Sequence, residues 1–143
     1  MDPLSITASI LAIVGAAQQA TKGVGKLRSL KHAKGDFSAL LNELADLQTI
    51  LTQVTALSHD LDARRTDGAV VGLNSLLKGA LAQVLELDQI VQYNLSKSDL
   101  DDAGRIRLDY KGWIINESKV LALQRKLLTT RSNIATAIGL VGT

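Results

Sequence analysis

The 143-residue sequence has no cysteine, a single proline and very few aromatic residues. The absence of cysteine excludes a disulfide framework and a thiolate metal site. Aromatic residues are 3% of the chain and hydrophobic residues 46%, so the core has to be built from Leu, Ile, Val and Ala, which favours helix over sheet. Because the only proline is Pro3, the rest of the chain is free of this helix breaker. We therefore expect one all-α domain over residues 1–143.

Charge is absent between Asp2 and Lys22. The segment is apolar almost all the way round a helix, which is unusual for a surface helix of a small bundle. A signal peptide is not favoured, because Asp2 stands where a signal carries Lys or Arg. A permanent membrane span is not favoured either, because Ser, Thr and Gln dilute a stretch near the lower length limit. We interpret the segment as a core helix, packed centrally among the others, that can be released.

Five basic residues follow this segment before the next acid: Lys22, Lys26, Arg28, Lys31 and Lys34. Residues 1–35 carry a net charge of +4 and the remainder −2, although the whole chain carries only +2. This asymmetry predicts that the N-terminal region meets an anionic surface. A solvated basic turn is the alternative that the sequence leaves open.

Apolar residues at three- and four-residue steps predict a bundle of about four main helices without a convincing strand. The expected ranges are 3–30, with Asp2 as N-cap, then 37–58 and 69–95, with polar loops at 59–68 and 96–104 and a last helix that starts near Arg107. Gly23 and Gly25 are expected to loosen or kink the first helix. The last helix has a seam at seven-residue intervals, formed by Trp113, Val120, Leu127, Ile134 and Val141.

The first helix has two faces that suit different contacts. Small residues form a ridge at four-residue spacing that would let helices approach closely, Ala8, Ala12, Ala16 and Ala20, with Gly15 beside it. Large aliphatic residues lie on the other side, Leu4, Ile6, Ile10, Ile13 and Val14.

Motifs for catalysis or for metal and nucleotide binding are incomplete. Residues 20–27 lack the first Gly and the Ser or Thr of a phosphate loop. The acidic loop that begins at Asp99 resembles the start of a calcium loop but has Ala103 at the fifth position and Tyr110 at the twelfth, where a bidentate Glu belongs. Neither His32 nor His59 has a Cys, a second His or a carboxylate at metal-ligand spacing. Basic residues are not interleaved with aromatic ones, as nucleic-acid binding would require. We expect no enzyme activity, no cofactor, no metal and no nucleic-acid partner.

Residues 1–13 resemble the start of the HeLo-like domains, which stand at the N-terminus of fungal NOD-like receptors and related signalling proteins. The likeness continues through residues 37–51, near Trp113 and in residues 127–139. The resemblance implies a bundle related to the HeLo domain of fungal incompatibility proteins and to the four-helix bundle of mixed-lineage-kinase-like effectors. It also implies homo-oligomerisation, a NOD-like or amyloid sensor that is C-terminal or separate, and a domain that stands alone or is excised from a longer receptor.

The resulting hypothesis is a cell-death effector domain of fungal immunity that is cytoplasmic at rest and disrupts the plasma membrane when it oligomerises. The aliphatic set listed above would contact lipid, and the small residues would pack helix against helix. The five basic residues would bind anionic headgroups, each contributing about 1 kcal/mol near such a surface. The alternative is a soluble adaptor or oligomerisation module that never touches lipid.

Overall fold

The computed structural model describes residues 5–29, 37–64, 66–96, 99–100, 106–107 and 110–141. Within them the chain forms four long helices, α1 (Ile6–Ser29), α2 (Phe37–Ala63), α3 (Gly68–Ser96) and α4 (Tyr110–Val141). Between α3 and α4, the two-residue strands β1 (Asp99–Leu100) and β2 (Ile106–Arg107) pair antiparallel. The expected all-α bundle is confirmed, and the strand pair is a small addition where a loop was predicted.

Three helix boundaries differ from the predicted ones. α1 begins at Ile6, and the proposed cap Asp2 lies outside the described residues. α2 continues to Ala63 because Leu61, 1% exposed, extends its buried stripe beyond the predicted end. α4 begins at Tyr110, since Arg107 belongs to β2.

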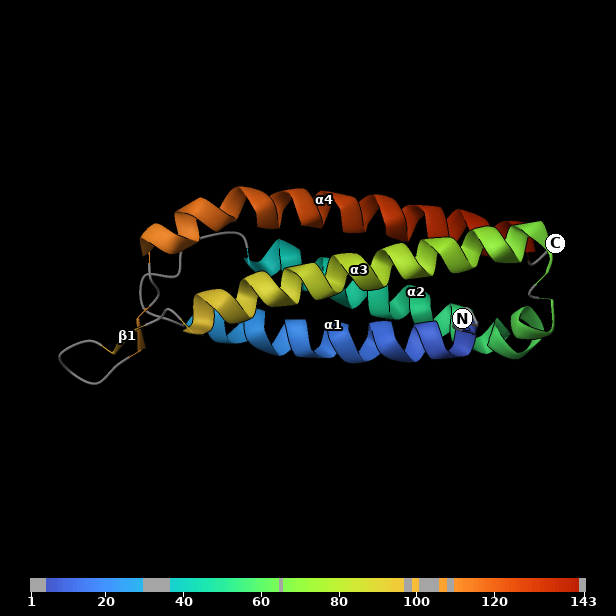
Figure 1. Ribbon diagram of the computed structural model, residues 1–143, viewed down its shortest axis with the longest axis horizontal. Helices are drawn as coiled ribbons and strands as arrows, with labels where there is room; N and C mark the ends of the chain where they lie inside the picture. Colours follow the sequence, from blue (N-terminus) through green and yellow to red (C-terminus); the bar gives the residue numbers. More distant parts are fainter. Residues whose placement is uncertain are drawn as a thin grey trace.

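The helices lie side by side with alternating directions along the chain. α1 and α3 run one way and α2 and α4 the other (Figure 1). The extensive contacts join α1 to α3 and α2, and α4 to α3 and α2. The order around the bundle is therefore α1, α2, α4, α3, and the short α2–α3 connection crosses one end diagonally. α1 and α3 are parallel neighbours that lie far apart in sequence.

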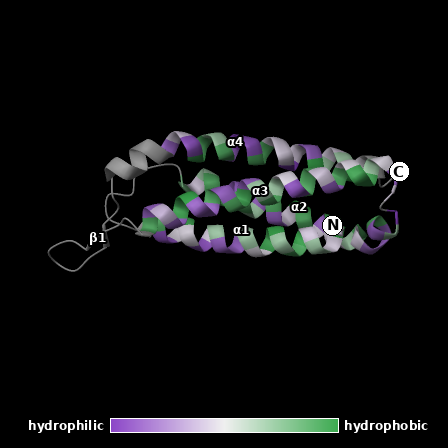
Figure 2. Ribbon diagram, viewed as in Figure 1, coloured by the Kyte–Doolittle hydropathy of each residue, from purple (hydrophilic) through white to green (hydrophobic). Residues whose placement is uncertain are grey.

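Each helix buries residues at alternating steps of three and four. In α1 this seam is Ile6, Ile10, Ile13, Ala17, Ala20, Val24 and Leu27, and in α3 it is Val70, Leu73, Leu77, Ala80, Val84, Leu87, Val91 and Asn94. Such spacing turns one stripe of each helix toward its neighbours, as in coiled coils. Hydrophobic and hydrophilic positions consequently alternate along the described helices (Figure 2). The core is aliphatic, as the composition predicts.

The expectation of a central first helix is wrong. α1 forms one side of the bundle, and Leu11 on its outer face is 69% exposed. Ala12, Gly15, Gln18 and Gln19 are exposed with it. Because these outer residues are a leucine, small residues and uncharged amides, the sequence of α1 carries no charge on this face although the helix buries only one stripe.

Candidate functional site

The aliphatic residues predicted to contact lipid lie mostly in the bundle core. Ile6, Ile10 and Ile13 are 2%, 4% and 0% exposed. Val14 is partly buried and packs against the same core, and Leu4 lies outside the described residues. These isoleucines can therefore meet lipid only if α1 leaves its place between α2 and α3.

The predicted alanine ridge does not stay on one face. Ala16 and Ala20 are buried, Ala8 is partly buried, and Ala12 and Gly15 are exposed. Each four-residue step turns the side chain by about 40° beyond a full turn, so the row winds around the helix. Packing against other helices within the bundle is thus limited to part of the ridge.

The small residues that face α3 recur every seven positions instead, at Ser9, Ala16 and Gly23. All three are buried. A Cβ placed on Gly23 would lie 2.6 Å from Val91 Cγ1, so only glycine fits this approach of the two helices. Gly23 and Gly25 do not interrupt α1, which is continuous from Ile6 to Ser29.

The first turn of α1 is attached to α2 by Asp62. The Asp62 carboxylate accepts hydrogen bonds from Ile6 N at 2.8 Å, Thr7 N at 3.4 Å and Thr7 Oγ1 at 2.7 Å. These amides belong to the first turn of a helix, where backbone donors have no partner within the helix. Ser5 Oγ accepts from Ala8 N at 3.0 Å and is the N-cap of α1 itself. The distance in sequence between α1 and Asp62 kept this contact from being predicted.

Further polar contacts join other neighbouring helices. Ser9 Oγ donates to Asn74 Oδ1 of α3 at 3.5 Å. Thr130 Oγ1 of α4 donates to Gln83 Oε1 of α3 at 3.0 Å. Polar pairs at fixed positions along apolar seams favour one register of the helices over shifted ones.

An ion pair joins α2 to α4. Arg131 Nε donates to Glu43 Oε1 at 2.7 Å, and the two side chains are 26% and 10% exposed. The hydrogen bond with the Glu43 carboxylate raises the pKa of Arg131 above its ordinary value. The guanidinium therefore stays charged, and the nearby Asp46 adds a further favourable charge interaction.

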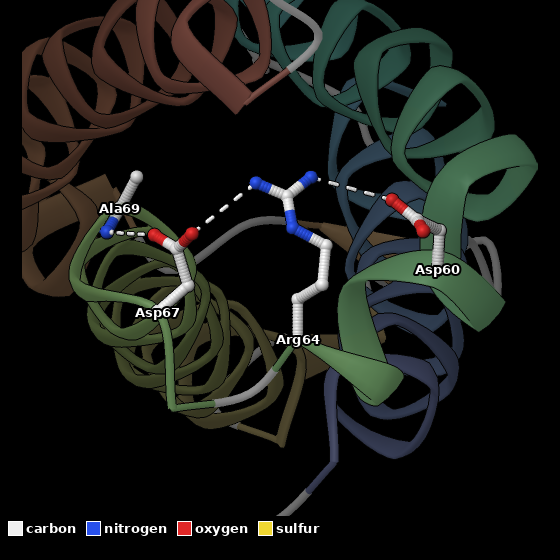
Figure 3. A network of polar contacts seen from close by, with 4 residues as sticks. All are labelled: Asp60, Arg64, Asp67 and Ala69. Carbon is white, nitrogen blue, oxygen red and sulfur yellow. Dashed lines mark hydrogen bonds and ion pairs between the residues drawn. The ribbon is translucent and has the colours of Figure 1, made fainter.

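A polar network shapes the connection from α2 to α3 (Figure 3). Arg64 donates to the carboxylates of Asp60 and Asp67, both at 3.3 Å. Asp67 Oδ1 accepts from Ala69 N at 2.9 Å and so caps α3. The hydrogen bond from Ala69 N, and next the one from Arg64, lowers the pKa of Asp67. The network is solvent-exposed and closes a turn, so we assign it a structural role.

The basic residues of α1 project from the opposite end of the bundle. Lys22, Lys26 and Arg28 are exposed, whereas Lys31 and Lys34 lie outside the described residues. α1 contains no acid, and its neighbour α2 contains four acids and no Lys or Arg. α1 thus carries a buried apolar stripe and an exposed basic end on the same helix.

The described residues also bear on metal binding and on membrane spanning. They contain no group of three or more His, Cys, Asp or Glu side chains that could hold a metal ion. One helix in this part of the chain, Gly68–Leu95 of α3, is long and apolar enough to cross a membrane by length and composition. Bundle helices with a buried seam meet the same criterion, and the seam of α3 is buried.

The fold and its contacts define a small helical-bundle domain. A family model described as the pigment biosynthesis cluster protein PigL N-terminal domain matches residues 1–139, and the chain belongs to this family. No curated protein and no solved structure matches the chain. This family agrees with a fungal helical domain, the coarser part of the resemblance.

Proposed function

We propose that this domain is a membrane-directed cell-death effector of the HeLo-like kind, without enzyme activity or a cofactor. At rest it is a cytoplasmic bundle. When a sensor clusters several copies, α1 leaves the bundle and meets the anionic face of the plasma membrane. The observation that carries the proposal is that α1 combines a buried isoleucine stripe with an exposed basic end.

Burial of α1 keeps the resting domain away from lipid. Fully burying an Ile side chain contributes about 1.5–3 kcal/mol, so Ile6, Ile10 and Ile13 together hold α1 in place. The seam then continues through Ala17 and Ala20, where α2 has large leucines such as Leu47 and Leu51. α1 therefore buries smaller side chains in its middle than α2 does.

The basic end of the released helix would be attracted to an anionic bilayer. Three Lys or Arg residues near an anionic bilayer contribute about 3 kcal/mol in total, and the attraction weakens as salt rises. The apolar stripe then adds burial in the acyl region, as in amphipathic helices that lie at the membrane surface.

Charge reversal tests the membrane contact without touching the core. The variant carries Lys22→Glu, Lys26→Glu and Arg28→Glu, all at exposed positions. The matched control reverses three exposed basic residues of α4, Lys119→Glu, Arg125→Glu and Lys126→Glu. Binding to vesicles with and without phosphatidylserine and release of an entrapped dye are measured over a salt series, with each protein clustered by a fused dimeriser.

We expect the α1 variant to lose binding and dye release and the α4 control to keep both. Equal losses of vesicle binding and dye release in the two variants would mean that binding depends only on the net charge of the domain and not on the basic end of α1. No dye release by the clustered wild type would refute the effector function. Replacing Ile10 and Ile13 by Glu is unsuitable, because both side chains lie in the core and the bundle itself would fail.

The alternative, a soluble adaptor, is favoured by one observation on α4. Leu121 and Leu128, seven residues apart, are 39% and 46% exposed and lie on one face of the helix. Such a pair suits a helix-to-helix contact with another protein. If Leu121→Ser with Leu128→Ser abolishes self-association in sedimentation and the wild type never binds vesicles, the adaptor reading replaces the membrane one.

A further inference from the structure

One side chain of α2 holds the end of α1 that carries its isoleucines. Asp62 uses both carboxylate oxygens, Oδ1 for Ile6 N and Oδ2 for the amide and hydroxyl of Thr7. The negative charge lies at the positive end of the α1 dipole, an arrangement that is favourable in itself. Hydrogen bonds to an ionised acceptor are also stronger than those between neutral groups.

This contact is not needed for α1 to be a helix. Ser5 caps the same turn from within the segment by accepting from Ala8 N. The Ser5 cap therefore persists wherever α1 goes, whereas the Asp62 contact joins two helices and is lost when they part. An interaction that exists in only one of two states shifts the equilibrium toward that state.

We propose that Asp62 is a latch that keeps α1 closed in the resting bundle. Opening breaks these three hydrogen bonds from α1 together, because the donors belong to consecutive residues of one turn. The latch acts at the Ile6 end of α1, while the basic end is already exposed to an anionic surface. The effect of the latch on membrane binding rests on the proposed function, whereas the contact between Asp62 and α1 does not.

The absence of native cysteine permits a direct test of opening. Ile13→Cys places a reporter thiol in the α1 seam, and Leu127→Cys places one in the seam of α4, a helix without extensive contact with α1; both positions are 0% exposed. The rate of thiol labelling by a small maleimide measures how often each seam opens. Each reporter is combined with wild-type Asp62, Asp62→Ala or Asp60→Ala, where Asp60 is the nearby exposed acid that binds Arg64.

We expect Asp62→Ala to raise labelling at the α1 reporter about tenfold, the scale of one lost charge-assisted hydrogen bond. Labelling at the α4 reporter should not change, and Asp60→Ala should change neither. A rise at both reporters in Asp62→Ala would show general destabilisation and overturn the latch. No rise at the α1 reporter would overturn it as well.

Dye release from phosphatidylserine vesicles separates the latch from the proposed function. Faster labelling at the α1 reporter together with faster dye release supports both. Faster labelling without any release by the wild type or Asp62→Ala leaves the latch in place and refutes the membrane function. A Thr7→Val variant, which removes one of the three hydrogen bonds, should give a smaller rise in labelling than Asp62→Ala.

Discussion

Replacing Gly23 with alanine has two opposing effects on stability: it improves helix propensity, but it crowds the contact between α1 and α3. In an open helix interior, alanine is favoured over glycine by about 1 kcal/mol. At Gly23, however, the new Cβ would lie 2.6 Å from Val91 Cγ1 and 3.2 Å from Gln92 Nε2. Val91 is fully buried and β-branched, so it has little freedom to move aside.

Overpacking of this kind costs about 1–3 kcal/mol. The propensity gain offsets part of it, so Gly23→Ala should change stability by between about 0 and −2 kcal/mol. Gly15 and Gly25 in the same helix have nothing within 4 Å of an added Cβ. Alanine at either site should therefore stabilise by about 0.5–1 kcal/mol.

Urea denaturation followed by circular dichroism measures the free energy of unfolding of all three variants. In thermal unfolding, each kcal/mol corresponds to a shift of roughly 2–4 °C in Tm for a chain of this size. The free energy of unfolding of Gly25→Ala should exceed that of Gly23→Ala by about 1–3 kcal/mol. Equal stabilisation by the two would refute the close approach of α1 and α3. Val91→Ala in the Gly23→Ala background should recover part of the loss, and a double-mutant cycle measures that coupling.

Glu43→Ala should lower the free energy of unfolding by about 2–3 kcal/mol, because it leaves the partly buried Arg131 without its carboxylate partner. In the wild type, the lowered pKa of Asp67 stabilises the fold above the unfolded-state pKa, and this contribution is lost as the pH falls through the folded pKa. Asp67→Asn should therefore show a smaller drop in Tm than the wild type between about pH 5 and pH 2. Asn94→Leu should raise stability by about 1 kcal/mol, since Asn94 Oδ1 is buried and finds no partner among the described residues.

Each of these has an outcome that would contradict it. For the ion pair, a loss no larger than that of Asp46→Ala, at an exposed neighbouring acid, would show that Glu43 acts only through its charge. For Asp67, parallel curves of Tm against pH for the wild type and Asp67→Asn would show that the Asp67 carboxylate does not contribute to the pH dependence of stability. For Asn94, a destabilised leucine variant in urea denaturation would show that the side-chain amide, which donates from Nδ2 to Ile90 O at 2.8 Å, stabilises the fold more than a buried leucine does.

The helices and their buried stripes follow from local pattern. The stripe from Phe37 to Val54 and the seam through Leu127 and Ile134 appear directly as three-, four- and seven-residue steps. In α3, the large apolar residue Leu81 fits the three- and four-residue steps of the sequence but is only partly buried, whereas its neighbour Ala80 is fully buried. Alanine carries too weak an apolar signal to mark a seam by itself.

The contacts between helices could not be predicted in the same way. The partners Asp62 and Ile6, like Glu43 and Arg131, lie far apart in the sequence, and no local spacing relates them. Which helices are neighbours also depends on the diagonal connection between α2 and α3. The first helix was placed at the centre because its outer residues are uncharged, whereas the structure places it at one side.

The sequence by itself determined that this protein is an aliphatic helical bundle with a basic end to its first helix, because composition, periodicity and charge are local properties of the chain. Tertiary structure alone decided that Ile6, Ile10 and Ile13 are buried while Lys22 and Lys26 stay exposed. It also decided that the close approach is made at Gly23 and the attachment at Asp62. The physical reason is that burial, steric fit and hydrogen-bond partners depend on which helices meet and in which register, and those relations exist only between distant parts of the chain.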